Sequence, residues 1–263
     1  MNIIVCIKQV PETQEVRLDP VTHTLKRDGI AAIINPFDLY ALEEGLRAKE
    51  SQGGTVTVMT MGPPQAEAAL REALGFGADA AVLVSDRAFA GADTWATALT
   101  LAKAVEKLGA ADLIFCGKQA IDGDTAQVGP MLATILDIPY VAWARKLAFN
   151  DGGSVTVERL LDHGYDAVET SLPALITVVK EINEPRVPSF KAKLKAKKEA
   201  IPVWGINDLG LVAADVGLSG SFTQVVKVFP PPARGTSEVW TGEATELAGR
   251  LWQRLKERSK AAG

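Results

Sequence analysis

One segment, running from Gly117 to Pro130, carries residues suited to binding a phosphorylated ligand. It follows an apolar run and leads into a helical pattern, so free backbone N–H groups at the helix start could bind a phosphate. Gly117 and Gly123 would let a ligand approach the backbone, and Gln119 could donate to ribose or phosphate oxygens. The alternative is a tight turn followed by a helix capped by Asp124 or Thr125. The spacing matches neither GxGxxG nor a P-loop.

Three other segments are expected at the same edge of the molecule. Cys6–Val10 and Thr60–Pro63 follow or end apolar runs, and Asn35–Asp38 contains an Asn-Pro turn. Each alone is typical of an ordinary turn. Together they would line one crevice where the strand order of a parallel sheet reverses.

A further segment, 86–97, also lies between a predicted strand and a predicted helix. One interpretation is a loop in which Asp93 or Thr94 caps the helix. The other is a second site for a phosphate or a ribose.

The sequence offers little other chemistry. No Ser/His/Asp arrangement, Cys/His pair or HExxH motif is visible, so no catalytic residue and no metal site is predicted. Cys6 and Cys116 lie in separate apolar runs and read as small buried side chains in a reducing, cytoplasmic compartment. Any redox chemistry would therefore belong to a bound cofactor.

The elements that must position these segments alternate between strands and helices. Apolar runs at 2–7, 55–61, 80–84 and 112–116 alternate with helical patterns near 38–50, 66–74, 94–108 and 125–136. That alternation predicts an α/β fold with a doubly wound, mostly parallel, Rossmann-like sheet and helices on both faces.

The second half of the chain has a different sequence pattern. A hairpin around Asp151-Gly152-Gly153, a strand pair near 165–172 and an apolar run at 173–179 would extend the sheet or form a small antiparallel layer. A helix from about 241 to 260 carries the stripe Leu247, Leu251 and Leu255. We therefore expect a nucleotide-binding domain at 1–230 and a C-terminal helical arm at 231–263.

Composition narrows the class of protein. The chain has 263 residues, 47% of them apolar, and a formal net charge of −4, so it can bury a full core and has no general attraction to nucleic acid. No run approaches the length of a membrane span. The opening residues read as mature sequence and not as a signal peptide.

Several motifs in one order resemble the β subunit of electron-transfer flavoproteins over essentially the whole chain. They are Val5-Cys6-Ile7-Lys8-Gln9-Val10, Asn35-Pro36-Phe37-Asp38, Met61-Gly62-Pro63, Gly75-Phe76-Gly77-Ala78-Asp79, Gly117-Lys118-Gln119-Ala120-Ile121-Asp122 and Asn183-Glu184-Pro185-Arg186. The resemblance implies an α subunit that carries FAD and an adenine nucleotide held in this chain. The contacts it implies are Cys6, Asn35, Pro36, Phe37, Asp38, Met61, Gly62, Gly117, Lys118, Gln119, Ala120, Ile121, Asp122, Gly123, Asp124, Thr125, Ala126, Gln127 and Val128.

The same resemblance leaves the bound nucleotide open. Ordinary family members hold structural AMP, whereas electron-bifurcating members hold a second FAD that takes hydride from NADH. The chain looks like the bifurcating type at 86–97 and 122–130, where small residues would leave room for a pyrophosphate. Electrons would then pass to ferredoxin or flavodoxin and, through the α-subunit FAD, to an acyl-CoA dehydrogenase. The residues suggested for NADH are Phe89, Gly91, Asp93, Thr94 and Thr97.

The lysine-rich segment 183–198 resembles the loop by which the family docks its dehydrogenase, although the lysines could also form a solvated face. The implied docking residues are Arg186, Phe190, Lys191, Lys193 and Lys195. The C-terminal helix, with Trp252 beside its leucine stripe, would wrap the α subunit, or else pack on its own domain. A stand-alone nucleotide-binding, stress-type protein is a third hypothesis, but it would need neither segment.

Overall fold

The computed structural model describes residues 1–12, 17–18, 25–26, 31–227, 229 and 237–261. They divide into two compact units, Met1–Val226 and Lys227–Gly263. Most of segment 13–31 and the three prolines at 230–232 lie outside the described residues. Within the first unit, nine of the described strands form a single sheet.

The sheet has the order β11-β10-β9-β12-β8-β1-β6-β7-β13, and every neighbouring pair from β9 to β13 is parallel. From β1 the chain moves to β6 and β7 on one side and then returns to β8 on the other. The strand order therefore reverses between β1 and β8. The parallel strands are β1 (Asn2–Cys6), β6 (Thr55–Met61), β7 (Ala80–Val84), β8 (Leu113–Gly117), β12 (Ala174–Val178) and β13 (Val203–Trp204).

Helices cover both faces of this sheet, which confirms the doubly wound fold. Leu42 of α1 and Leu70 of α2 belong to the core on one face, while Leu101 of α3 and Leu132 of α4 belong to the core on the other. The central strands are consequently buried on both faces and read as continuous apolar runs. The helices are α1 (Pro36–Gln52), α2 (Glu67–Phe76), α3 (Thr94–Leu108), α4 (Val128–Ile135), α5 (Phe190–Ala196) and α6 (Ala244–Ala261).

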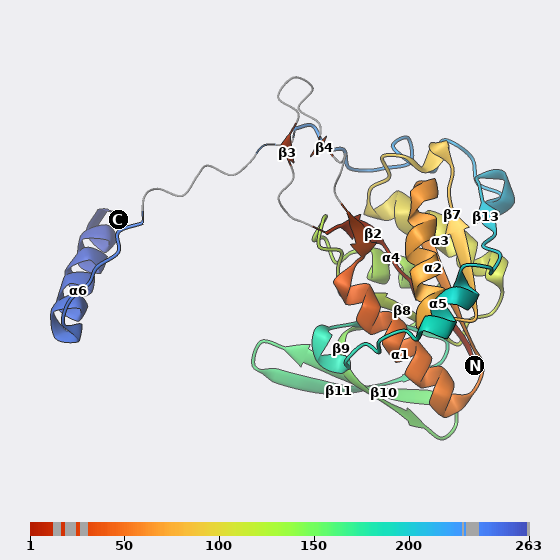
Figure 1. Ribbon diagram of the computed structural model, residues 1–263, viewed down its shortest axis with the longest axis horizontal. Helices are drawn as coiled ribbons and strands as arrows, with labels where there is room; N and C mark the ends of the chain where they lie inside the picture. The colour runs from red at the N-terminus through yellow and green to blue at the C-terminus, as the bar shows by residue number, and fades with distance from the viewer. Residues whose placement is uncertain (13–16, 19–24, 27–30, 228, 230–236, 262–263) are drawn as a thin grey trace. The chain divides into compact units, whose positions relative to one another are not determined.

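The predicted hairpins extend the same sheet and do not form a separate layer. β9 (Tyr140–Asn150), β10 (Ser154–Leu161) and β11 (Gly164–Ser171) pair antiparallel to one another, and Figure 1 shows them as long strands along one edge. The turn between β9 and β10 places Gly152 and Gly153 at positive φ.

Shorter elements complete the unit. β2 (Gln9–Pro11) pairs with β5 (Ala32–Ile34), and β3 (Arg17–Leu18) pairs with β4 (Leu25–Lys26). Single turns of 3₁₀ helix lie at η1 (Pro64–Ala66), η2 (Arg87–Phe89), η3 (Lys180–Ile182) and η4 (Asn207–Leu209).

Candidate functional site

The carboxyl ends of three neighbouring strands bring the predicted segments together. Cys6, near the end of β1, lies opposite Cys116 of β8 on one side and Met59 of β6 on the other. Both cysteines are buried, as expected. The segments that follow these strands therefore start side by side at the point where the strand order reverses, which is where open α/β sheets bind ligands.

Asn35 connects two of these segments through a fully buried side chain. Its Nδ2 donates to the carbonyl of Gln119 over 2.9 Å, and its Oδ1 accepts from the N–H of Ile121 over 3.1 Å. Its own N–H donates to the carbonyl of Lys8 over 2.8 Å. One amide side chain thus holds the loop after β8 against the start of α1.

Asp38 joins the same segments from the first turn of α1. Its Oδ2 accepts from the N–H of Lys8 over 2.7 Å, and its Oδ1 accepts from the N–H of Gly117 over 3.2 Å. Burial raises the pKa of Asp38 to about 7, although hydrogen bonds from Asn35, Lys8 and Gly117 act in the opposite direction. Both carboxylate oxygens are engaged by backbone, so Asp38 fixes the geometry of the site.

The two glycines of the loop after β8 have different surroundings. A Cβ on Gly117 would lie 2.6 Å from the carbonyl carbon of Phe37 and close to Asp38. The absence of a side chain at Gly117 therefore lets the start of α1 pack closely against the end of β8. The predicted role of Gly117 in letting a ligand approach the backbone stays a prediction. A Cβ on Gly123 would meet nothing within 4 Å. Open space beside Gly123 fits the approach of a ligand to the backbone.

The loop between β8 and α4 is held by polar side chains of its own and by Lys8, which follows β1. Lys8 Nζ lies 2.7 Å from a carboxylate oxygen of Asp122, and Gln119 Nε2 donates to Asp124. Asp124 and Ala126 both have φ of 55°, a conformation that favours glycine. Such strain in non-glycine residues often accompanies function.

The start of α4 corrects a second prediction. The helix begins at Val128 and not near 125, and its N-cap is Gln127, whose side chain makes no capping hydrogen bond. Neither Asp124 nor Thr125 serves as the cap. The Gln127 side chain therefore does not cap the N–H groups of Val128 and Gly129, and Pro130, the third residue of α4, has no N–H.

The segment at 86–97 meets this loop through one hydrogen bond, from Thr94 Oγ1 to Gln127 Oε1 over 3.0 Å. Asp93 caps α3 through the N–H of Ala96, as predicted, and its other oxygen accepts from the N–H and the hydroxyl of Thr223. Burial would raise the pKa of Asp93, but the hydrogen bonds from Ala96 and Thr223 hold it below its usual value.

The remaining residues suggested for NADH, Phe89, Gly91 and Thr97, also make contacts within the protein, and their part in binding NADH stays a prediction. Phe89 is buried in the core, and a Cβ on Gly91, whose φ is 76°, would lie 3.2 Å from Leu218 Cβ. The backbone N–H of Thr97 donates to the carbonyl of Asp93. Of the five, Thr94 is hydrogen-bonded to the loop before α4.

One residue near the site was missed by the sequence analysis. This residue is Trp143 of β9, and the ammonium of Lys118 lies 4.7 Å from the centre of its ring. Trp143 has φ of 60°, which is rare for an aromatic residue. The sequence pattern of the strand around Trp143 gives no sign of this backbone conformation.

Comparison with known proteins decides the family. A model described as "Electron transfer flavoprotein domain" matches residues 22–209. The electron transfer flavoprotein subunit beta of Thermoanaerobacterium thermosaccharolyticum is 52% identical over 259 residues, which cover 98% of this chain and 99% of the relative. The chain belongs to the electron transfer flavoprotein β-subunit family.

Two further relatives of this β subunit carry other names. The caffeyl-CoA reductase-Etf complex subunit CarD of Acetobacterium woodii is 48% identical over 260 residues, covering 98% of this chain and 99% of the relative. Protein FixA of Azotobacter vinelandii is 49% identical over 240 residues, covering 89% and 85%. Membership in the family implies an α subunit as partner. No helix among the described residues could cross a bilayer.

The segment predicted to dock a dehydrogenase is tied to α1 of the β subunit. Arg186 pairs with Glu43 over 2.8 Å and with Glu50 over 2.6 Å, while Asn183 donates to the carbonyl of Tyr40 and to Glu44. Burial would raise the pKa of Glu43, but its bonds to Arg186 and Arg47 hold it below its usual value. Arg186 is therefore an anchor of this segment.

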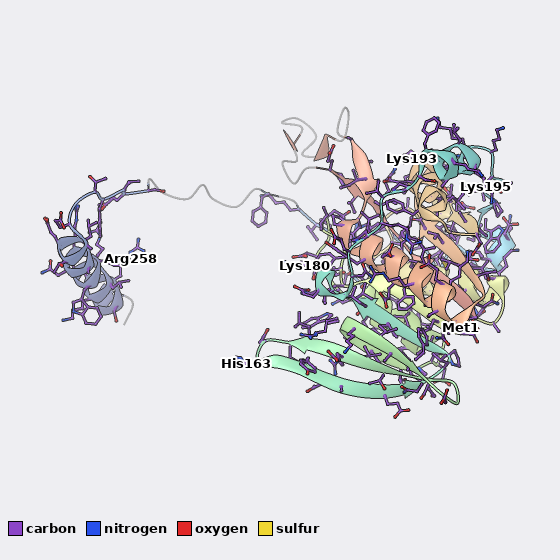
Figure 2. All side chains as sticks on the ribbon, turned by 60° about the horizontal axis from the view of Figure 1, so that its bottom comes forward. Met1, His163, Lys180, Lys193, Lys195 and Arg258 are labelled. Carbon is purple, nitrogen blue, oxygen red and sulfur yellow. The ribbon has the colours of Figure 1, made fainter. Side chains whose placement is uncertain are left out.

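Beyond this anchor the segment turns outward. Ser189 caps α5, and the first residue of that helix, Phe190, is 77% exposed. Lys191, Lys193 and Lys195 follow on the same short helix, where Figure 2 labels Lys193 and Lys195. Lys193 packs near Gly75 of α2. An exposed aromatic side chain thus stands beside several cations.

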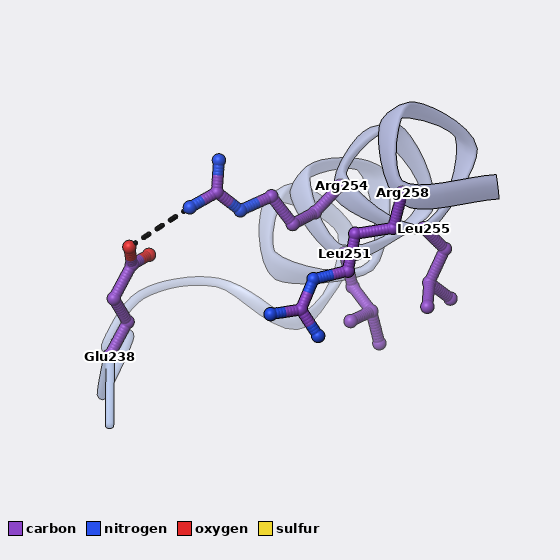
Figure 3. A pocket seen from close by; sticks show the side chains of 5 residues that line it. All are labelled: Glu238, Leu251, Arg254, Leu255 and Arg258. Atoms are coloured by element: carbon purple, nitrogen blue, oxygen red, sulfur yellow. Dashed lines mark hydrogen bonds and ion pairs between the residues drawn. The ribbon is translucent and has the colours of Figure 1, made fainter. Parts of the chain in front are cut away.

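In the described part of the C-terminal unit, α6 carries exposed apolar side chains. Leu251, Trp252 and Leu255 are all more than half exposed. A small surface pocket is lined by Glu238, Leu251, Arg254, Leu255 and Arg258, and Arg254 donates to Glu238 over 3.1 Å (Figure 3).

Proposed function

We propose that this β subunit holds FAD at the carboxyl ends of β1 and β8 and belongs to an electron-bifurcating complex. The bound FAD would accept hydride from NADH and divide the two electrons between ferredoxin or flavodoxin and the α-subunit FAD, which serves an acyl-CoA dehydrogenase. The observation that carries the proposal is the hydrogen bond between Thr94 and Gln127, because it joins the two loops that an extended dinucleotide would need.

The donor set suits such a ligand. The uncapped N–H groups of α4 and the ammonium of Lys118 could bind phosphate. The exposed carboxylates of Asp122 and Asp124 could accept from ribose hydroxyls, and Lys8 offsets the charge of Asp122. The protein's part would be to bind and orient the cofactor with backbone and side-chain dipoles, so no side chain need act as an acid or a base.

The names of the relatives support a CoA-thioester partner. CarD is named as part of a complex with a caffeyl-CoA reductase. At 48% identity over nearly the whole of both chains, a related partner for this β subunit is a reasonable extension.

Anaerobic titration of the heterodimer with NADH tests the proposal. We expect NADH to bleach the flavin absorbance, and we expect NADH oxidation with a low-potential acceptor to require the high-potential acceptor as well. The control is the Lys107→Met variant, which changes a cation far from the site in sequence. NADH that leaves the flavin absorbance unchanged would refute the bifurcating role and leave the family assignment intact.

The second candidate is an ordinary β subunit holding structural AMP. Segment 86–97 favours this candidate, because its Asp93 and Phe89 are already engaged within the protein and offer little to a second ligand. A mononucleotide would need only the loop between β8 and α4.

We also propose that the segment around α5 docks the dehydrogenase and that α6 docks the α subunit. Phe190 would enter an apolar pocket of the dehydrogenase, while Lys191, Lys193 and Lys195 approach an acidic patch and raise the association rate. On α6, the exposed leucines and Trp252 would be covered by the α subunit.

A further inference from the structure

We propose that Trp143 is a positioning residue of the nucleotide site, which holds the ammonium of Lys118 where it can bind the nucleotide's phosphate. The inference rests on the proposed nucleotide site between β8 and α4, and it adds to that site a residue from β9.

Lys118 is placed by its backbone and by the indole. Its N–H donates to the carbonyl of Val178 over 2.9 Å, which fixes the start of its side chain at the end of β8. Its ammonium lies 4.7 Å from the Trp143 ring centre, within the range of a cation–π interaction. Among the described residues no carboxylate or carbonyl accepts from this ammonium, so it keeps its hydrogen-bonding capacity for an anion.

The backbone at Trp143 is strained, and this strained conformation directs the indole toward Lys118. Between the pairs Val141–Ile176 and Ala144–Val178, β9 has one residue more than β12, which is a β-bulge. Trp143 lies in this bulge at φ of 60° and is 36% exposed. Burial of the indole is thus incomplete and does not account for the strain. Bulges commonly redirect a side chain, and here the side chain meets Lys118.

Thr177 links this bulge to α4. Its buried Oγ1 accepts from the N–H of Trp143 over 3.2 Å and lies 3.1 Å from the hydroxyl of Tyr140. Its Cγ2 would be 2.6 Å from a Cβ on Gly129, in the first turn of α4. The residue that anchors Trp143 therefore also packs against the helix start proposed to bind phosphate.

A second lysine–tryptophan pair provides a matched control. The ammonium of Lys107 lies 5.1 Å from the Trp204 ring, but it also donates to the carbonyl of Asp208 over 2.8 Å. The ammonium of this pair already has a hydrogen-bond acceptor within the protein, and the pair is remote in sequence from the loop between β8 and α4.

The test measures AMP and FAD affinity by titration calorimetry, with the complete heterodimer stripped of nucleotide. We expect Lys118→Met to weaken binding about tenfold and to reduce its dependence on salt, because one ion contact is lost. Trp143→Leu keeps the strained backbone but removes the π face, and should weaken binding about threefold to tenfold. Trp143→Phe should recover part of this loss, and Lys107→Met should change nothing.

The double variant gives the decisive comparison. If Trp143 acts through Lys118, the double variant binds no more weakly than Lys118→Met alone. Unchanged affinity in Trp143→Leu, or losses that simply add, would overturn the inference. Lost heterodimer assembly at normal nucleotide affinity would assign Trp143 to the subunit interface instead and would also overturn it. If the wild-type complex binds neither nucleotide, the proposed function itself fails.

Discussion

Replacing Gly117 by alanine tests how the nucleotide site is built. The new Cβ would lie 2.6 Å from the carbonyl carbon of Phe37 and 2.7 Å from its Cβ. A backbone atom cannot move aside without shifting the start of α1. Overpacking of this kind costs about 1–3 kcal/mol. Weakening the 3.2 Å bond from Gly117 to Asp38 adds about 1 kcal/mol.

Gly117→Ala should therefore lower the free energy of unfolding by about 2–4 kcal/mol. The matched control is Gly123→Ala in the same loop, where the new methyl group meets nothing within 4 Å. It should change stability by less than about 0.5 kcal/mol, yet weaken nucleotide binding because it occupies the ligand's space.

Urea unfolding of the full chain, followed by circular dichroism, measures the first effect, and calorimetric titration with AMP measures the second. Equal stability of the two variants would refute the packing argument at Gly117. Wild-type affinity in Gly123→Ala would refute the assignment of the open space to the ligand.

Three further predictions concern charge and docking. Because burial raises the pKa of Asp38 from 3.8 to about 7, the folded state binds this proton more tightly, and the group costs stability as pH rises from about 4 to 7. Asp38→Asn should therefore gain about 2–4 kcal/mol relative to wild type between pH 4 and pH 8 in urea titrations; a difference independent of pH would contradict this. Arg186→Met should cost about 1–2 kcal/mol in unfolding free energy, because Glu43 is nearly buried, and speed proteolysis near α5; unchanged cleavage would argue against anchoring. Phe190→Ala should slow electron transfer to the dehydrogenase with flavin content unchanged; unaltered kinetics would reject the docking role.

The sheet could be predicted because its central strands are buried on both faces. The runs at 55–61 and 80–84 coincide with β6 and β7, because the second is wholly apolar and the first, although it contains three threonines, is mostly buried. Asp93 was predictable as a cap because capping is a local interaction.

The details of the site could not be predicted because they depend on distant segments or unusual backbone. Asp38 meets Lys8 and Gly117, which are 30 and 79 positions away. The late start of α4 follows from the left-handed conformation of Asp124 and Ala126. An alanine in the sequence gives no indication of such a conformation. The family resemblance named these segments as nucleotide contacts without giving the hydrogen bonds among them.

The central claim is that this β subunit holds FAD. The most direct test is to denature the purified heterodimer and identify the adenine nucleotides it releases by chromatography and mass spectrometry. The proposal predicts two FAD molecules and no AMP for each heterodimer. One FAD and one AMP would contradict it and assign the chain to the ordinary members of the family.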